Sequence, residues 1–232
     1  YHHYLPKDNI TEAVNYNDTS GYERLTINEG FVARYHNDNI SISSITSYQY
    51  LDDCMTLDQD FSPKSMFTMQ QMQSEHSLTE EIVIRNTNTN QQWQWLSGAF
   101  IFGKWLDMSS PVTFKKDGIE GLILNNINNG LHTVFPDNNM TFGTDSFVIA
   151  SNFRIPTIGA ALYHQSDIRL GRWNITAGIR FDYEQTSMRY NSNATVPYRF
   201  DLTMTEYKEL YTEFKGREKQ HFFEILPKIA VE

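Results

Sequence analysis

Apolar and polar residues alternate with a period of two along WNITAGIRFDY, from Trp173 to Tyr183. Successive side chains of a strand point to opposite sides of a sheet, whereas on a helix this spacing would scatter the apolar residues around the circumference. The segment therefore predicts a β-strand with two unlike faces. One face carries Trp173, Ile175, Ala177, Ile179 and Phe181, and the other carries Asn174, Thr176, Arg180, Asp182 and, just beyond, Glu184.

The same alternation recurs in segments that pair as hairpins. The first strand is predicted from Tyr22 to His36, with Phe31, Ala33 and Tyr35 on one face. Asn37-Asp38-Asn39 predicts a turn, because Asn and Asp tolerate left-handed backbone conformations. The chain then returns through NISISSITSYQYLDD, in which Ile40 and Ile42 share a face before the pattern shifts near Ile45.

Two further hairpins are predicted downstream. SLTEEIVIRN (77–86) is followed by polar residues 87–92 and by WQWLSGAFIFGKW (93–105). One face of this last strand carries Trp93, Trp95, Ala99, Ile101 and Trp105, and the other carries Leu96, Phe100 and Phe102. The third hairpin runs from IGAALYHQSDIRL (158–170) through a tight turn at Gly171-Arg172 into the opening segment, which continues to about Tyr190.

Loops separate these hairpins. An acidic loop is predicted from Cys54 to Lys64. A long irregular loop, functional or mobile, is predicted from about 106 to 153, with a short helix or turn around Gly118 to Asn126. A polar loop is predicted to include Tyr198 and Phe200. The remaining predictions are a tilted strand or short helix over 205–220 and a last strand, HFFEILPKIAVE, interrupted at Pro227.

Composition narrows the possible functions. The chain has 232 residues, a net charge of -9 and 14% aromatic residues, which favour β structure. Nucleic acid is excluded as a partner, because its binding needs clustered Lys and Arg. No stretch approaches the roughly 20 apolar residues of a membrane-spanning helix. Cys54 is the single cysteine and forms no internal disulfide.

Candidate chemistry is sparse. The His residues lack metal-ligand spacing, and His2-His3 in YHHY is interpreted as a solvated terminal stretch. Asp52, Asp53, Asp58 and Asp60 are weighed as a calcium cluster, although the EF-hand glycine and closing glutamate are missing. There is neither a nucleophile elbow nor a phosphate-binding glycine loop. The prediction is therefore a chain without enzymatic activity, catalytic residues, a metal or a cofactor.

Connections of a few residues at one end of the hairpins and of ten to forty at the other are typical of outer-membrane barrels. SITSYQ (44–49), DQDFSP (58–63), EEIVIRN (80–86), WQWLSGAFIF (93–102), ALYHQSDIRLGRWNITAGIRFDYE (161–184) and EILPKIAVE (224–232) follow one another in the chain. In order and spacing they resemble the middle of the barrel of TonB-dependent receptors. SLTEEIVIRN departs from the SQELRL-like segment of that family, and the chain ends in Val-Glu rather than in an aromatic residue.

The resemblance implies an all-β fold of antiparallel hairpins that form part of a transmembrane β-barrel with short turns and long extracellular loops. Residues 1–232 would form a partial barrel domain of roughly eight to ten strands without the plug domain, and the first and last strands would be unpaired until further segments close the ring. The N-terminus YHHYLPKDN has neither an initiator Met nor an apolar core, which favours a chain cut from a longer one.

The resemblance also implies a location and partners. The chain would lie in the outer membrane of a Gram-negative bacterium and take up a scarce ligand, by default a ferric siderophore, with energy from TonB delivered through a missing N-terminal region. Trp173, Ile175, Ala177, Ile179 and Phe181 would face outer-membrane lipid, and Asn174, Thr176, Arg180, Asp182 and Glu184 would face the lumen. Ligand-binding residues stay unassigned.

One alternative remains open. A soluble secreted β-sandwich could turn the same apolar face onto a core and bind glycans through surface Trp and Tyr. The two hypotheses differ in what covers the apolar face, lipid or protein, and in whether the chain needs detergent.

Overall fold

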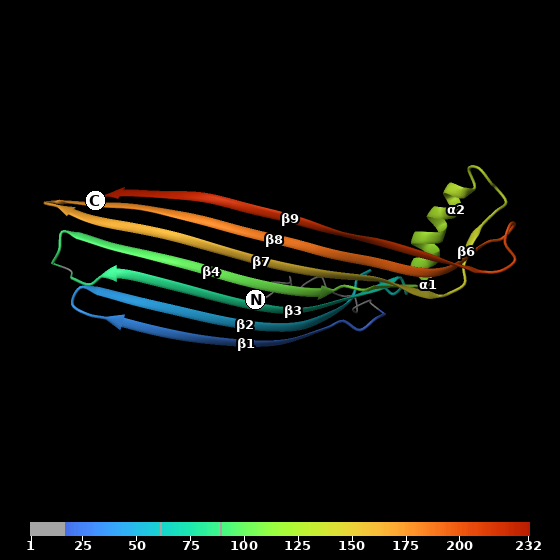
Figure 1. Ribbon diagram of the computed structural model, residues 1–232. Helices are drawn as coiled ribbons and strands as arrows, with labels where there is room; N and C mark the ends of the chain where they lie inside the picture. Colours follow the sequence, from blue (N-terminus) through green and yellow to red (C-terminus); the bar gives the residue numbers. More distant parts are fainter. Residues whose placement is uncertain (1–16, 61, 89) are drawn as a thin grey trace, which may run out of the picture.

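The computed structural model describes residues 17–60, 62–88 and 90–232, and it consists mainly of one antiparallel sheet (Figure 1). The nine strands are β1 (Gly21–His36), β2 (Ile40–Asp58), β3 (Phe67–Asn86), β4 (Trp93–Ser109), β5 (Val112–Lys115), β6 (Met140–Phe142), β7 (Ser146–Leu170), β8 (Trp173–Phe200) and β9 (Lys208–Val231). The long strands follow the order β1-β2-β3-β4-β7-β8-β9, while β5 pairs with β3 and β7, and β6 with β8. The prediction of an all-β fold of antiparallel hairpins from a barrel wall is confirmed.

The connections at the two ends of the sheet differ in length, as the sequence predicts. Residues 37–39, 87–92 and 171–172 form the short connections at the end drawn on the left of Figure 1. The opposite end carries the longer connections 59–66 and 201–207 and the segment from 110 to 145. We call these the turn end and the loop end of the sheet.

Two strands extend further than the hydrophobic pattern predicts. Residues 54–58 were expected to begin a loop but belong to β2, because they pair with 68–72 of β3. Tyr198 and Phe200, expected in a polar loop, belong to β8, where they pair with Lys208 of β9 and Met140 of β6. Both predictions are wrong because polar side chains obscure the alternation there, while backbone pairing with distant segments continues.

The structure of the C-terminal segment also differs from the prediction. The segment 205–220 and the final segment are not separate elements, since β9 runs without a break from Lys208 to Val231. Pro227 does not interrupt it and faces Ile179 of β8 in the register. Asn174 and Glu232 exchange both backbone hydrogen bonds, and such pairs alternate along an antiparallel ladder, so the nitrogen of Pro227 points away from β8. Proline is therefore tolerated here without loss of a hydrogen bond to β8.

Regular structure occupies much of the stretch from 106 to 153. β4 continues to Ser109, β5 follows directly, and β7 already begins at Ser146. Between them lies a continuous helical segment composed of α1 (Lys116–Gly118), the π-helical turn η1 (Ile119–Leu124) and α2 (Asn125–Leu131). The short helix predicted around Gly118 to Asn126 is confirmed and is longer than expected.

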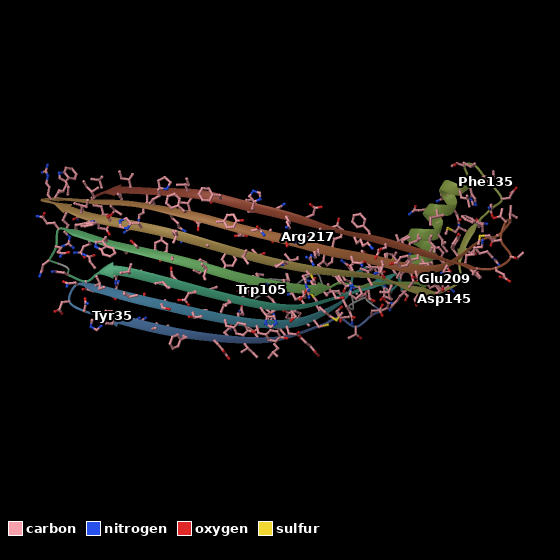
Figure 2. All side chains as sticks on the ribbon, viewed as in Figure 1. Tyr35, Trp105, Phe135, Asp145, Glu209 and Arg217 are labelled. Atoms are coloured by element: carbon pink, nitrogen blue, oxygen red, sulfur yellow. The ribbon has the colours of Figure 1, made fainter. Side chains whose placement is uncertain are left out.

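The described part of the sheet has no conventional hydrophobic core. Among the described residues only Ile119, Met140, Ala161 and Val196 are buried hydrophobic side chains. Many large apolar side chains are exposed instead, for example Phe31, Leu162 and Ile229. Figure 2 shows side chains standing on both sides of the long strands with no second layer of main chain over them. This arrangement does not favour the β-sandwich alternative, in which a second sheet would cover the apolar face.

No helix in the described part of the chain is long and apolar enough to cross a membrane.

The sheet is open at both edges within the described residues. β1 pairs with β2 and β9 pairs with β8, and neither of these edge strands has a second neighbour. Unpaired N–H and C=O groups along edges of this length readily pair with other chains. In a closed barrel both edges would be joined through further strands.

Gly171 in the tight turn between β7 and β8 has a φ of 63°, a conformation that side chains with a Cβ adopt only at a cost. We expect Gly171→Ala to lower the free energy of unfolding by about 1–2 kcal/mol. Gly30→Ala is the matched control, because Gly30 lies in β1 and a Cβ there would meet its nearest atom, the backbone oxygen of Thr46, only at 4.0 Å. Equilibrium refolding in urea would measure both variants, and equal stability of the two would contradict the role assigned to this turn.

Candidate functional site

The two sides of the sheet differ in chemistry. Alternation along β8 places Asn174, Thr176, Arg180, Asp182 and Glu184 on one face, and Trp173, Ile175, Ala177, Ile179 and Phe181 on the other. Paired residues of neighbouring strands share a face, so the register extends this division from β1 to β9. We call the face of Arg180 the polar face and the face of Phe181 the apolar face.

The apolar face carries a band of exposed hydrophobic side chains next to the turn end. On β8 the band runs from Trp173 to Tyr183, and the charged residues that follow it on β4, β7 and β8 are Asp107, Arg154 and Arg189. A strand that rises about 3.3 Å per residue covers about 33 Å over this segment, or about 23 Å along the axis at a tilt of about 45°. That height matches the roughly 25 Å apolar band of outer-membrane barrels.

Tryptophans lie near both limits of this band. Trp93 and Trp173 begin their strands at the turn end, and Trp105 lies on the side of the loop end. Their exposed fractions are 52%, 50% and 46%, so none is packed in a core. An indole combines an apolar ring with one N–H donor and is enriched at membrane–water interfaces. These three residues therefore occupy positions like those of the aromatic girdles of outer-membrane barrels.

Polar groups within the band are bonded to each other. The carboxylate of Glu80 accepts hydrogen bonds from the hydroxyl groups of Ser44, at 2.6 Å, and Thr46. The ring of His164 contacts the hydroxyls of Ser97, at 2.8 Å, and Ser166, at 3.0 Å. Such pairing lowers the cost of placing polar atoms on an apolar surface.

The polar face is crossed by hydrogen-bonded networks. The first network centres on Asp53 of β2, which is 6% exposed. Its Oδ2 accepts hydrogen bonds from Arg24 Nη2 at 2.8 Å, Arg24 Nε at 3.2 Å, Tyr22 at 2.9 Å and Gln73 at 3.0 Å. These donors come from β1 and β3, so one carboxylate ties three strands together on this face.

A second network joins β3, β7 and β8. The hydroxyl of Tyr163 donates to Glu81 at 2.8 Å, and the guanidinium of Arg180 lies 5.7 Å from the centre of the Tyr163 ring. Arg180 also donates to both carboxylate oxygens of Asp182, at 2.8 to 3.0 Å. The Tyr163 ring covers Gly98 so closely that a Cβ there would lie 2.1 Å from it. Glycine at position 98 is therefore what allows this ring to lie flat on β4.

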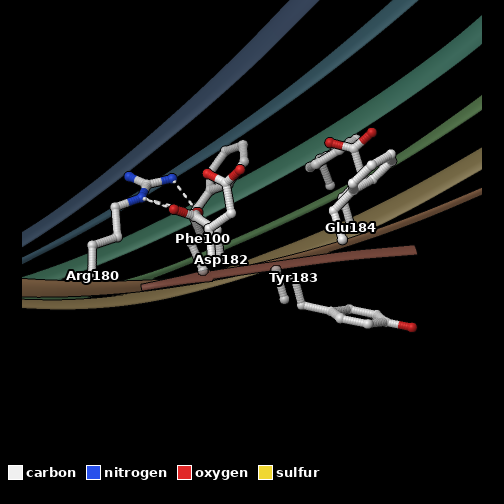
Figure 3. Close-up of a pocket in the computed structure, with 10 residues that line it drawn as sticks. Phe100, Arg180, Asp182, Tyr183 and Glu184 are labelled. Atoms are coloured by element: carbon white, nitrogen blue, oxygen red, sulfur yellow. Dashed lines mark hydrogen bonds and ion pairs between the residues drawn. The ribbon is translucent and has the colours of Figure 1, made fainter. Parts of the chain in front are cut away.

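A pocket of about 350 Å³ opens beside this second network. Its lining combines aromatic rings with acidic groups and one cation: Phe100, Phe102, Phe222, Asp182, Glu184, Glu224 and Arg180. In Figure 3, Arg180, Asp182 and Glu184 point to the same side of β8 as Phe100, and Tyr183 points to the other side. The pocket can hold water and a polar solute, and it contains no nucleophile next to a base.

The structure thus brings three of the five polar residues predicted for the lumen, Arg180, Asp182 and Glu184, to one pocket. Thr176 lies nearer the turn end and donates to Asp167 at 2.5 Å. Asn174 exchanges backbone hydrogen bonds with Glu232 at the end of β9. That the polar face lines a lumen stays a prediction.

The sequence pattern did not identify Asp53, Glu81 or Tyr163 as network members. Each occupies an alternate position of its strand, so the period of two is the one signal that could place it on the polar face. The partners are 20 to 82 residues away along the chain, and only the register between strands selects them.

The acidic residues weighed as a calcium site do not come together. Asp52 and Asp53 point to opposite faces of β2, and Asp53 is engaged by Arg24. Asp60, in the loop after β2, accepts hydrogen bonds from the hydroxyl and the N–H of Ser62, which lower its pKa below the ordinary value. The described residues contain no group of three His, Cys, Asp or Glu side chains arranged for a metal. His2 and His3 lie outside the described residues.

Taken together, the fold and the site define a class: a sector of an antiparallel β-barrel wall with one polar and one apolar face. Among solved structures, the chain is similar to the ferric yersiniabactin uptake receptor of Yersinia pestis, with a TM-score of 0.58 and 14% identity over 93% of this chain. At this identity the likeness shows the fold. The chain spans 27% of the length of that receptor.

No family model and no curated protein matches the chain. The membrane pore complex of pneumolysin aligns with a TM-score of 0.13 and 8% identity, which is too low for a shared fold.

Proposed function

We propose that this chain is part of the barrel wall of a TonB-dependent receptor in the outer membrane of a Gram-negative bacterium. The observation that carries the proposal is that the same strands present an apolar face on one side and a polar face on the other. An exposed apolar band of about 23 Å lies opposite a face of bonded carboxylates, guanidinium groups and hydroxyls. A bilayer is the environment that favours the first surface, and a hydrated interior favours the second.

In this arrangement Trp173, Ile175, Ala177, Ile179 and Phe181 contact lipid. Asn174, Thr176, Arg180, Asp182 and Glu184 line the interior, together with the networks around Asp53 and Tyr163. The register supports this division, because turning the polar face toward the lipid would place Arg180 and Asp182 in hydrocarbon. Short connections are periplasmic in outer-membrane barrels, so the turn end would face the periplasm and the loop end the cell exterior.

The proposed activity is uptake of a scarce ligand, with a ferric siderophore as the first candidate. The similar receptor takes up ferric yersiniabactin, and this function, together with the barrel motifs of the sequence, supports this ligand class. TonB would act through parts of such a receptor that this chain does not span. The similarity of this fold to that of an uptake receptor supports a transport role rather than an enzymatic one.

Orientation in the membrane tests the proposal. Epitope tags inserted singly after Asp38, in a short turn, and after Leu202, in the connection between β8 and β9, lie at opposite ends of the sheet. In intact cells expressing the whole receptor, antibody is expected to label the Leu202 tag and to miss the Asp38 tag until the outer membrane is permeabilised. Labelling of both tags, or recovery of the protein outside the outer-membrane fraction, would contradict the proposal.

The same cells test the ligand class. Uptake of a labelled ferric siderophore is expected, and labelled cobalamin serves as the matched substrate. If the tags have the expected orientation but the cells take up only cobalamin, the assignment as a receptor stands and the ferric siderophore is ruled out as its ligand.

A further inference from the structure

Three arginines form a row across neighbouring strands on the apolar face. Arg189 of β8 is the register partner of Arg154 on β7 and of Arg217 on β9. Arg189 has the same parity along β8 as Phe181, so all three side chains stand on the apolar face. All three residues are exposed. In this row, like charges face each other directly across two strand pairs, an arrangement that is destabilising without a counter-ion.

Further cations extend the row along β9. Lys215 and Lys219 flank Arg217 at alternate positions and share its face. Two carboxylates partly balance these charges: Asp107 accepts from Arg154 at 2.6 Å, and Glu213 accepts from Lys215 at 2.7 Å. In the described part of the chain no ion pair joins Arg189 or Arg217 to a carboxylate. A chain of net charge -9 therefore presents a local excess of positive charge here.

A hollow of about 400 Å³ lies within the row. Its lining comprises Trp105, Leu106, Asp107, Arg154, Pro156, Ser187, Arg189 and Arg217. Figure 2 places Trp105 on β4 and Arg217 on β9 near the middle of the long axis of the sheet. Guanidinium groups bind phosphate through pairs of hydrogen bonds, and Ser187 adds a hydroxyl donor to the same hollow.

The position of the row relative to the apolar band indicates where its ligand comes from. Trp105 and Pro156 are register partners at the edge of the band, and Asp107 and Arg154 form the next pair on the same face toward the loop end. An anion bound by the row would therefore have its apolar part directly beside Ile158 and Leu162, which are 47% and 62% exposed. A free anion would contact the arginine row alone. A lipid with a phosphorylated headgroup would contact the arginine row with its phosphate and the adjoining apolar band with its acyl chains.

We propose that Arg154, Arg189 and Arg217 bind the phosphate groups of a lipid in the outer leaflet of the membrane, with its acyl chains along the apolar band. This rests on the proposed function, because it requires the apolar face to meet a bilayer with the loop end outward. The site goes beyond transport, since it holds the receptor to a particular class of lipid rather than to its cargo.

The test compares the whole receptor with a variant in which Arg154, Arg189 and Arg217 are all replaced by Gln. Both are inserted into phosphatidylcholine vesicles containing either lipid A with its two phosphates or the same lipid with the phosphates removed. We expect the variant to retain at least about tenfold less of the phosphorylated lipid after extraction in mild detergent. The dephosphorylated lipid is expected to be retained weakly and equally by both proteins.

A matched control removes three arginines from the opposite face, Arg34, Arg85 and Arg169, which are exposed on the polar face. This control has the same net charge as the test variant and is expected to retain the phosphorylated lipid like the unchanged receptor. A third variant, with Lys in place of Arg154, Arg189 and Arg217, keeps the charges but lacks the paired donors of a guanidinium group. It is expected to retain more of the phosphorylated lipid than the Gln variant and less than the unchanged receptor, which separates loss of charge from loss of the paired hydrogen bonds.

Several outcomes would overturn the lipid site. They are equal lipid retention by the Gln variant and the unchanged receptor, equal retention of both lipids, and full displacement of the lipid by inorganic phosphate, which would indicate a site for a free anion. Insertion is measured independently of lipid retention, as protection of the receptor from protease by the vesicle membrane. Failure of the unchanged receptor to insert contradicts the proposed function, whereas normal insertion without lipid selectivity contradicts the lipid site alone.

Discussion

Leu162→Lys is expected to destabilise the barrel wall in a bilayer by about 2–4 kcal/mol, because it places an ammonium group within the apolar band. The side chain of Leu162 is 62% exposed and points away from the polar face. In water such a substitution on an exposed strand position would cost within about 0.5 kcal/mol. The size of the effect therefore reports whether hydrocarbon or water covers this face.

Val148→Lys provides the control for this experiment. Val148 lies on the same strand and the same face, is 45% exposed and stands on the loop side of Arg154. We expect a change of less than about 1 kcal/mol there. Reversible unfolding in urea from lipid vesicles measures both variants, and a small effect at both positions would show that lipid does not cover the band.

Asp53→Ala is expected to lower the free energy of unfolding by about 2–3 kcal/mol, since it removes the acceptor of four hydrogen bonds. The loss leaves the guanidinium of Arg24 and the amide of Gln73 without this partner on the polar face. The Arg24 side chain is 48% exposed, so water replaces part of the interaction and the effect stays below that of a fully buried ion pair.

Asp52→Ala is the neighbouring control, because Asp52 is exposed on the opposite face and accepts one hydrogen bond, from Tyr50 at 3.2 Å. It is expected to change stability by less than about 0.5 kcal/mol. A double-mutant cycle of Asp53→Ala with Arg24→Met measures the coupling between the pair. Additive effects of the two substitutions would mean that the network contributes nothing as a unit.

The period of two was sufficient to predict most of the strands. It placed Trp173 and Asn174 on opposite faces and located the turn at Gly171, because both features depend on residues adjacent in the sequence. The period was insufficient where polar residues occupy both faces. The end of β2 after Cys54 and the end of β8 at Phe200 became strands through pairing with β3, β9 and β6.

The candidate site divides in the same way. Arg180, Asp182 and Glu184 could be grouped from the sequence, since alternate residues of one strand lie on one side. Their neighbours Phe100 and Phe222 come from β4 and β9, and no local pattern relates those strands to β8. The arginine row is a further case, because Arg154, Arg189 and Arg217 are separated by long stretches of chain and meet only through the register.

The sequence by itself determined the all-β class, the two unlike faces and the difference in length between the connections at the two ends. These follow from the geometry of single strands and from residues that favour turns, which act over a few positions. The tertiary structure decided the register, and with it the Asp53 and Tyr163 networks, the pocket and the arginine row. The physical reason is that hydrogen bonds between strands join any two extended segments, so the choice of partner residues depends on the packing of the whole sheet.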